Sequence, residues 1–206
     1  MSLEIWITFT IASFALLAIP GPTVLLVVSY AIRQGKSSGW STVPGVALGD
    51  LTAMTVSLVG AGAILTASST LFTILKLAGA FYLIWLGFKM WREKPVLGDL
   101  QETNQKRTKM SMFLNAYIVT ALNPKGIVFF IAFVPQFVNP ELPVLMQFVV
   151  LETTFVILAA ANVTVWALLA GEMRSKFQRP GVLKILSRTG GGFLIGAGLV
   201  TATIQE

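Results

Sequence analysis

The sequence predicts an all-α integral membrane protein with six transmembrane helices, and three observations support this fold class. Of its 206 residues, 55% are hydrophobic and 12% are charged, whereas a soluble domain has about 25% charged residues. Long apolar segments occur six times, at 5–32, 39–66, 70–91, 112–135, 143–170 and 182–204. A helix that spans a membrane needs about 20 such residues. Finally, Lys and Arg gather in every second link between these segments.

The first and fourth segments are each interrupted by proline. Segment 5–32 has no charged residue and contains Pro20-Gly21-Pro22, and segment 112–135 contains Asn123-Pro124-Lys125. No basic residue precedes the first segment, and it is longer than the apolar region of a signal peptide, so we expect it to be a span. Proline lacks an N–H and clashes with the carbonyl four residues earlier. The two breaks should therefore free backbone carbonyls, namely those of Leu16, Ala18 and Thr120.

Four charged residues lie away from the ends of these segments: Asp50, Lys76, Lys125 and Glu152. A charge at the bilayer centre costs about 2.5–3.5 kcal/mol, so each of them is a functional candidate. Lys76 lies near enough to the start of its segment to extend its ammonium toward the interface, which leaves a structural role open. For the other three, the alternative is a structural ion pair among themselves.

Glycines mark the second and last segments. Gly45 and Gly49 lie four residues apart directly before Asp50, and Gly192 and Gly196 have the same spacing in segment 182–204. Small residues at this spacing let two helix backbones approach closely. We interpret both pairs as packing seams, and a seam on the surface would also allow a homodimer.

The cations predict how the chain crosses the membrane. Apart from Lys76 and Lys125, they lie in the links after the first, third and fifth segments or at the start of the last segment: Arg33, Lys36, Lys89, Arg92, Lys94, Lys106, Arg107, Lys109, Arg174, Lys176, Arg179, Lys184 and Arg188. Basic links face the cytoplasm. Both termini should therefore face outward, and the net charge of +6 indicates orientation in the bilayer rather than a surface for nucleic acid.

The two halves of the chain correspond to each other. Pro22 and Pro124 are separated by the same number of residues as Asp50 and Glu152. Each half thus contains a broken segment, an acidic second segment and a third segment. Because three spans per half is an odd number, the second half enters the membrane in the opposite orientation. We expect one membrane domain, 1–206, with repeat 1 at 1–91, a cytoplasmic loop at 92–111 and repeat 2 at 112–206, and a binding site near the midplane.

The composition excludes several classes of protein. Cys and His are both absent, which removes disulfide frameworks, thiol redox carriers, histidine-dependent catalysis and soft-metal sites. An intramembrane aspartyl protease needs two membrane aspartates, but the only Asp besides Asp50 is Asp99, in a basic loop. We therefore expect neither an enzyme nor a bound metal or cofactor.

Four motifs make the chain similar to a known family. They are Pro20-Gly21-Pro22 with the following 23–27, the stretch 45–50, the stretch 76–87 that begins Lys76-Leu77-Ala78-Gly79, and Asn123-Pro124-Lys125 with the stretch up to Phe137. In this order and at these spacings, the whole chain closely resembles the LysE/RhtB family of bacterial amino-acid exporters. Thr23 departs from the family pattern, which often has Asn after Pro-Gly-Pro, and this leaves the choice of substrate open.

The resemblance implies six helices in two inverted halves and export of amino acids or related metabolites across the bacterial cytoplasmic (inner) membrane, driven by the proton motive force. A passive channel or a non-transporting membrane scaffold is the alternative. The expected partners are an amino-acid substrate, protons and the lipid bilayer.

The substrate-binding candidates are Pro20, Gly21, Pro22, Thr23, Asn123, Pro124 and Lys125. Half-helices that begin at Thr23 and Lys125 would offer free N–H groups to a carboxylate. The freed carbonyls, together with Asp50 or Glu152, would receive an ammonium group. Asp50 and Glu152 are the candidates for proton coupling, with Asp50 favoured because it lies beside the Gly45/Gly49 seam, and Lys76 is a further candidate.

Overall fold

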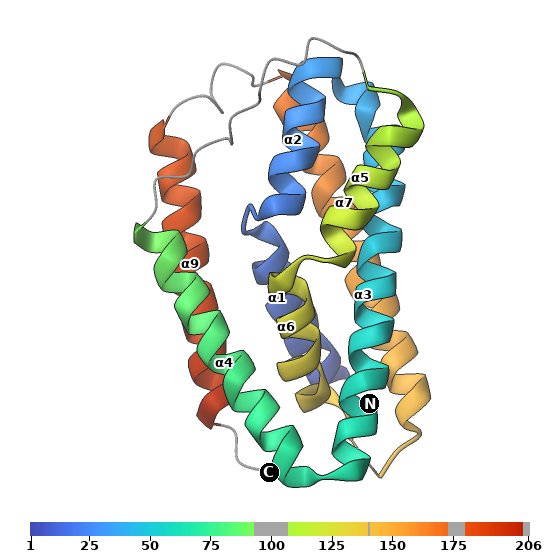
Figure 1. Cartoon of the computed structure of the whole chain (residues 1–206), viewed down its shortest axis with the longest axis vertical. Coiled ribbons are helices and arrows are strands. Elements are labelled where there is room, and N and C mark those ends of the chain that lie inside the picture. Colours follow the sequence, from blue (N-terminus) through green and yellow to red (C-terminus); the bar gives the residue numbers. More distant parts are fainter. Residues whose placement is uncertain (93–106, 140, 173–179, 204–206) are drawn as a thin grey trace.

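A computed structural model describes residues 1–92, 107–139, 141–172 and 180–203, and its regular structure within these ranges is entirely helical (Figure 1). Most of the predicted loop 92–111 lies outside the described residues, as does the link at 173–179. The helices are α1 (Leu3–Ala18), α2 (Pro22–Gln34), η1 (Lys36–Ser38), α3 (Gly39–Ala67), α4 (Ser69–Arg92), α5 (Lys109–Ala121), α6 (Pro124–Ala132), η2 (Val134–Phe137), α7 (Val144–Glu172) and α9 (Pro180–Thr203).

The two proline motifs break their helices as the sequence predicts. α1 and α2 meet at an angle of 54°, and α5 and α6 at 43°. In both pairs the second helix begins at a proline, Pro22 or Pro124, because the fixed φ of proline suits the first helical position, where its missing N–H costs nothing. Pro44, in contrast, lies inside α3 without interrupting it.

Among the described residues, the stretches Lys36–Ile64 and Val144–Ala170 are each long and apolar enough to cross a membrane, and the count rises to four if each bent pair is one span. α1 begins and α9 ends at the same end of the molecule, while α2 ends at the opposite one (Figure 1). Six spans, the inverted repeat and the outward orientation of the termini stay predictions.

Glycines let the helices pack closely at two seams. An added Cβ on Gly45 of α3 would lie 2.5 Å from the Phe113 carbonyl of α5, and one on Gly49 would lie 2.8 Å from the Tyr117 carbonyl. α3 and α5 therefore touch through their backbones. α4 and α9 meet in the same way at Gly87 and Gly191, where the corresponding distances are 2.5 Å.

The prediction for the last helix is wrong in its register. An added Cβ on Gly192 or Gly196 meets nothing within 4 Å, whereas one on Gly198 would lie 2.7 Å from the Ala80 carbonyl. The seam inside the molecule therefore uses Gly191 and Gly198, which are seven residues apart along α9 and so lie on one face. A contact between copies through Gly192 and Gly196 stays a prediction.

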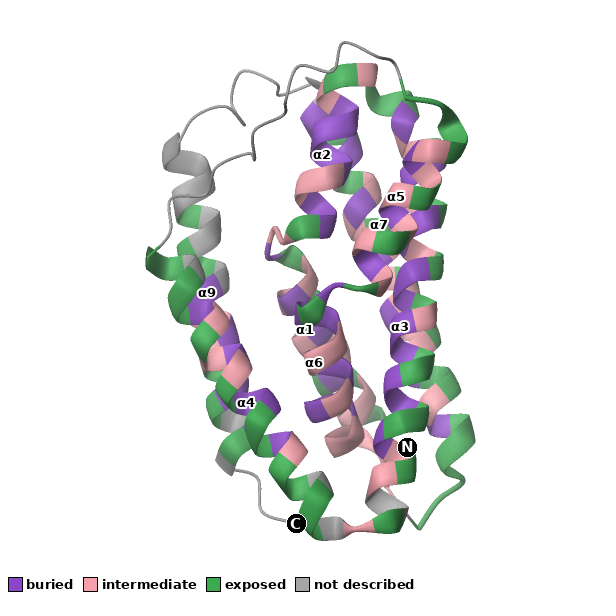
Figure 2. Cartoon of the chain, in the orientation of Figure 1, coloured by how far each residue is buried: buried purple, intermediate pink, exposed green. Residues whose placement is uncertain are grey.

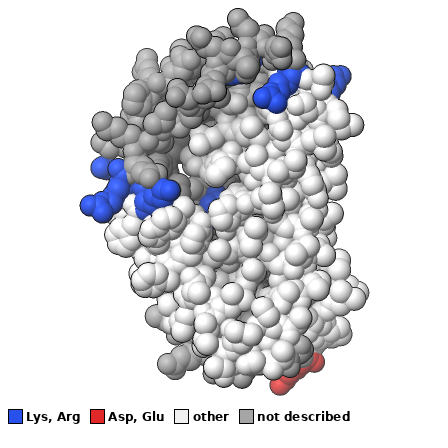
Figure 3. Space-filling view, in the orientation of Figure 1, with Lys and Arg blue, Asp and Glu red and all other residues white. Residues whose placement is uncertain are grey.

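Exposed residues lie on nearly every helix (Figure 2), and many of them are large and apolar. Phe81 and Leu145 are each 77% exposed, and Ile11 is 64% exposed. On the face shown in Figure 3, Lys and Arg lie mostly in the half of the molecule where α2 ends, acidic side chains lie at the opposite end, and the belt between them is largely uncharged. Such a surface suits a hydrocarbon environment and identifies the chain as a multi-pass membrane protein.

Candidate functional site

The two helix breaks lie against each other through one side chain. Lys125, the second residue of α6, donates from Nζ to the carbonyl of Leu16 at 3.2 Å and to that of Ile19 at 3.1 Å. Both carbonyls belong to the end of α1, just before Pro20. The sequence predicted a free carbonyl at Leu16, and this prediction is wrong, because the carbonyl accepts from the N–H of Ile19 at 3.3 Å as well as from the Lys125 ammonium.

The first break uses donors from other helices to satisfy its carbonyls. Besides the two contacts of Lys125, the carbonyl of Leu17 accepts a hydrogen bond of 2.9 Å from Nδ2 of Asn162 on α7. A cation near a helix C-terminus also interacts favourably with the helix dipole. At the other side of the break, Gly21 precedes α2 and provides no side-chain cap for its N–H groups.

The second break is satisfied largely by its own residues. The Asn123 side chain accepts from the N–H of Lys125 at 3.1 Å, and the N–H of Asn123 donates to the Thr120 carbonyl at 3.0 Å. The predictions of a free N–H at Lys125 and a free carbonyl at Thr120 are therefore wrong. The reason is the asparagine directly before the proline, since Asn is a strong N-capping residue.

Thr23 joins the two breaks at a second point. Its Oγ1 lies 3.4 Å from Nδ2 of Asn123 and 3.2 Å from Oγ1 of Thr120. All three side chains are buried. The residue at which the chain departs from the family pattern is thus a contact between α2 and the second break.

Asp50 faces the breaks because of the α3–α5 seam. Gly49 brings α3 against α5, and Asp50, the next residue, is 8% exposed and lines a cavity together with Lys125. The two opposite charges attract each other across this space. Within the described part of the chain, Asp50 has no hydrogen-bond donor and no cation in direct contact, so its carboxylate is available to a ligand.

The cavity between the breaks has a volume of about 30 Å³, which is room for one or two water molecules and too little for an amino acid. Its polar lining consists of Thr23, Asp50, Asn123, Lys125 and Asn162. Its apolar lining includes Val24, Val46, Phe155, Ala159 and Val163. The site is therefore closed in this conformation and would have to widen to admit a substrate.

Aromatic rings close the cavity toward the end of the molecule where α1 begins. Phe155 of the cavity wall packs against Phe130 with ring centroids 4.9 Å apart, and Phe129 packs against Phe133 at the same distance. The series continues through Phe137 to Phe9. Phe9, Phe129 and Phe130 are fully buried, so this aromatic series belongs to the packed interior beside the cavity.

The structure does not bring Glu152 and Lys76 to this cavity. Glu152 lies on α7, where its Oε1 and the Thr55 hydroxyl of α3 are 2.6 Å apart. Lys76 is buried in α4, and neither residue is among those that line the cavity. Of the other predicted site residues, Gly21 lines the cavity, while Pro20, Pro22 and Pro124 shape the breaks around it.

Asn162 is the polar site residue that sequence reasoning missed. It is an amide within the long apolar segment 143–170, and a polar residue in a span is itself a signal of function. Outside the two proline motifs, the prediction considered only charged residues within the spans, and so it omitted Asn162.

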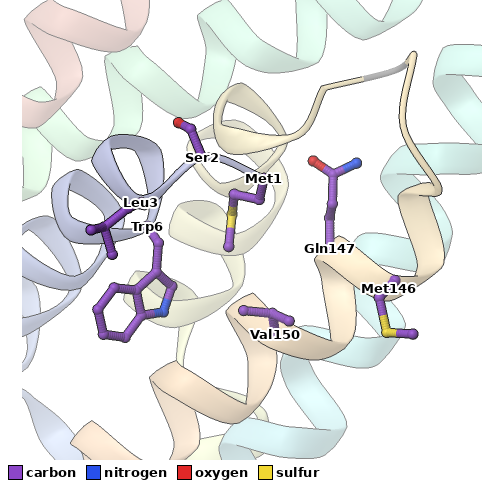
Figure 4. Close-up of a pocket in the computed structure, with 7 residues that line it drawn as sticks. All are labelled: Met1, Ser2, Leu3, Trp6, Met146, Gln147 and Val150. Carbon is purple, nitrogen blue, oxygen red and sulfur yellow. The ribbon is translucent and has the colours of Figure 1, made fainter.

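Two larger hollows have no charged side chain in their linings. One, of about 420 Å³, lies between the start of α1 and that of α7 (Figure 4), and its lining consists of Met1, Ser2, Leu3, Trp6, Met146, Gln147 and Val150. The other, of about 520 Å³, is an apolar groove between α3, α4, α5 and α6.

In the described part of the chain, no three Asp or Glu residues are grouped so as to hold a metal ion.

Comparison with known proteins gives a consistent picture. Residues 14–204 match the family model described as LysE type translocator. The chain is 32% identical, over 98% of its own length and 98% of the relative's, to a homoserine/homoserine lactone efflux protein of Salmonella typhimurium. It is 26% identical to a leucine efflux protein of Salmonella choleraesuis, over 99% of its own length and 97% of the relative's.

A membrane protein of Vibrio cholerae without an assigned function is also similar, at 26% identity over the full length of both chains. No solved structure matches. The family match spans both helix breaks, Asp50, Asn162 and every other polar residue of the cavity. The chain therefore belongs to the family of LysE type translocators.

Proposed function

We propose that the chain is a secondary active exporter of amino acids or related metabolites across the cytoplasmic membrane of a bacterium. The observation that carries this proposal is a buried pair of opposite charges, Asp50 and Lys125, that line one cavity between two broken helices. Charges in the middle of membrane spans are costly and mark transport pathways. Relatives named as efflux proteins for homoserine, homoserine lactone and leucine support the same class of substrate.

The site offers both polarities that a zwitterionic amino acid requires. The α-ammonium group would bind the carbonyls of Leu16 and Ile19 and the carboxylate of Asp50. The carboxylate group would bind the first N–H groups of α2, at Thr23 and Val24, which have no side-chain cap and lie at the positive end of a helix dipole. Lys125 would supply a cation to the same carboxylate.

Proton antiport would use Asp50. Its carboxylate lies in the cavity where the substrate ammonium would bind, so a proton and the ammonium compete for one group. Binding of either species excludes the other, which is the basis of exchange. Glu152 is the second candidate for proton coupling, because it is an acidic residue within a predicted span. It contacts Thr55 and does not line the cavity.

Alternating access is the transport cycle that we propose. The cavity of about 30 Å³ has to open toward one side and then toward the other, and the proline breaks provide hinges in α1–α2 and α5–α6. Inverted repeats move in this manner around a central site. The aromatic series from Phe155 to Phe9 would separate on the side toward which the substrate leaves.

A passive channel is the alternative function, and transport kinetics distinguish the two. In proteoliposomes loaded with L-homoserine or L-leucine, an exporter of this kind gives saturable efflux and counterflow that an imposed pH gradient accelerates. Asp50→Asn should abolish the acceleration, whereas Glu4→Gln, an exposed residue near the start of α1, should not. Non-saturable flux that ignores the pH gradient would indicate a channel, and no flux of either amino acid above empty vesicles would contradict the proposed substrates.

A further inference from the structure

Lys125 already makes the contacts that the proposed function reserves for the substrate ammonium. Its Nζ donates to two backbone carbonyls of α1, at 3.1 and 3.2 Å, in a site where the side chain is 9% exposed. A primary ammonium has three donors. The Lys125 ammonium and an α-ammonium group are thus chemically equivalent at this position, and only one of them fits at a time.

We propose that Lys125 is a tethered stand-in for the substrate amine: it fastens the first helix break shut when no substrate is bound, and a substrate must displace it with its own protonated amine. We call the two hydrogen bonds from Lys125 to the carbonyls of Leu16 and Ile19 the latch. The identity of the substrate rests on the proposed function, but the latch itself does not. This inference names a positioning residue and a substrate class, namely small molecules with a free, protonated amine.

The two ends of the latch belong to different halves of the chain. Leu16 and Ile19 lie at the end of α1, and Lys125 lies at the start of α6. The two hydrogen bonds therefore hold the first break against the second. Because hydrogen bonds to charged groups in a low-dielectric site are strong, removing the ammonium should free α1 to move relative to α6.

Asp50 gives the displaced ammonium a second position. It lines the same cavity and has no hydrogen-bond donor among the described residues. A lysine side chain is flexible at four rotatable bonds, so its head group can exchange one acceptor for another. Lys125 would thus stay paired in both states, with the α1 carbonyls when the site is closed and with Asp50 or the substrate carboxylate when the site is occupied.

Gly21 leaves room for the Lys125 ammonium. An added Cβ at Gly21 would lie 3.3 Å from Nζ of Lys125. The backbone there has φ −102° and ψ −170°, which an alanine adopts without strain. The close neighbour of position 21 is therefore the latch, and Gly21→Ala is a substitution that crowds the latched ammonium with little other effect on the break.

The chain has no cysteine, so one introduced thiol can report whether the site opens. Ala159→Cys places a thiol at a fully buried position of the cavity wall, and Ser37→Cys places one at an exposed position of η1 as a reference. The rate of modification by a water-soluble maleimide is measured on purified protein in nanodiscs, without any amino acid. This readout requires no transport.

With Lys125 in place, the thiol at position 159 should react slowly. Lys125→Met, which has a similar length and no charge, should accelerate its modification at least about tenfold, because a single charged hydrogen bond changes an equilibrium by at least that factor. Lys125→Arg should keep the slow rate. Gly21→Ala should accelerate modification when Lys125 is present and add nothing to Lys125→Met. The reference thiol at position 37 should react alike in all variants.

Equal rates at position 159 with and without the Lys125→Met substitution, normalised to the reference thiol, would overturn the latch. The latch would also be overturned if Gly21→Ala accelerated modification equally in the protein with Lys125 and in the Lys125→Met variant. The substrate class is tested by displacement: L-homoserine and L-leucine should accelerate modification in the protein that retains Lys125, and their N-acetyl derivatives should not. If modification responds to Lys125→Met but to neither amino acid, Lys125 still fastens the break, and displacement by these amino acids, with the proposed substrates, is contradicted.

Discussion

The two helix breaks come from similar motifs, yet they present opposite chemistry to the site. At the α1–α2 break, the carbonyls of Leu16, Leu17 and Ile19 accept side-chain hydrogen bonds from α6 and α7, and the start of α2 has no side-chain cap. At the α5–α6 break, Asn123 caps the N–H of Lys125. The first break thus uses side chains of other helices, while the second is capped by its own Asn123 and extends the Lys125 ammonium toward the first.

The residue before each proline explains this difference. Asn123 carries an amide that folds back onto the helix it precedes, whereas Ile19 and Gly21 have no polar side chain. Two breaks with similar proline motifs therefore need not present the same chemistry to the site. The first break supplies backbone carbonyls, and the second supplies the Lys125 ammonium that binds them.

Asp50 and Glu152, which have the same offset in sequence as Pro22 and Pro124, should differ most in their effect on export. Asp50 lines the cavity, while Glu152 pairs with Thr55 outside it. Asp50→Asn should lower the pH-driven component of export about 100-fold, the upper range of coupling between two ligands, and Glu152→Gln should leave it within about twofold. The measurement is efflux from proteoliposomes with and without a pH gradient. The reverse ranking of the two variants would assign proton coupling to Glu152.

A smaller effect should come from the seam that positions Asp50. Gly49→Ala places a Cβ 2.8 Å from both the Tyr117 carbonyl and the Thr120 Cβ, so α3 and α5 must separate, at a cost of about 1–3 kcal/mol. Thermal unfolding in detergent should show the lower stability. Gly60→Ala in the same helix is the matched control, since its Cβ meets nothing within 4 Å. Equal melting temperatures for the two variants would mean that the seam is not tightly packed.

A single substitution can remove the side-chain cap of the second break. Asn123→Ala deletes the cap of α6 and should destabilise that helix by about 1 kcal/mol. Asn123→Ser keeps a capping oxygen and should recover most of the loss. Hydrogen exchange of the amides at the start of α6 is the measurement, with faster exchange expected only for the alanine variant. Faster exchange at the start of α2 as well would show that the two breaks are coupled through Thr23.

The sequence predicted the parts of the site that follow from chain-local chemistry. Proline geometry placed both breaks, and the glycine pair before Asp50 predicted the seam that positions it. The pairing across the breaks could not be predicted, because Lys125 and Leu16 meet only through tertiary packing. The register of the α9 seam failed for a related reason: Gly192 and Gly196 have the four-residue spacing, but the contact with α4 uses Gly191 and Gly198, and only the position of the neighbouring helix determines this.

Thr23 gives the smallest expected effect and the finest test of how the breaks are joined. Its hydroxyl lies within hydrogen-bond distance of both Asn123 and Thr120. Thr23→Val has nearly the same shape and removes the hydroxyl, so it should cost about 1 kcal/mol, the net value of a typical hydrogen bond. Thr23→Ser should retain most of that stability.

Thermal unfolding of both variants, followed by the efflux assay, separates a structural role from a role in binding. If the hydroxyl only joins the helices, Thr23→Val should lower the melting temperature and leave the preference between L-homoserine and L-leucine unchanged. If it also contacts the substrate, the preference should shift as well, because its oxygen lies at the start of α2, where the substrate carboxylate is expected. A stable Thr23→Val variant with an altered preference would make Thr23 a specificity residue rather than a link between the two breaks.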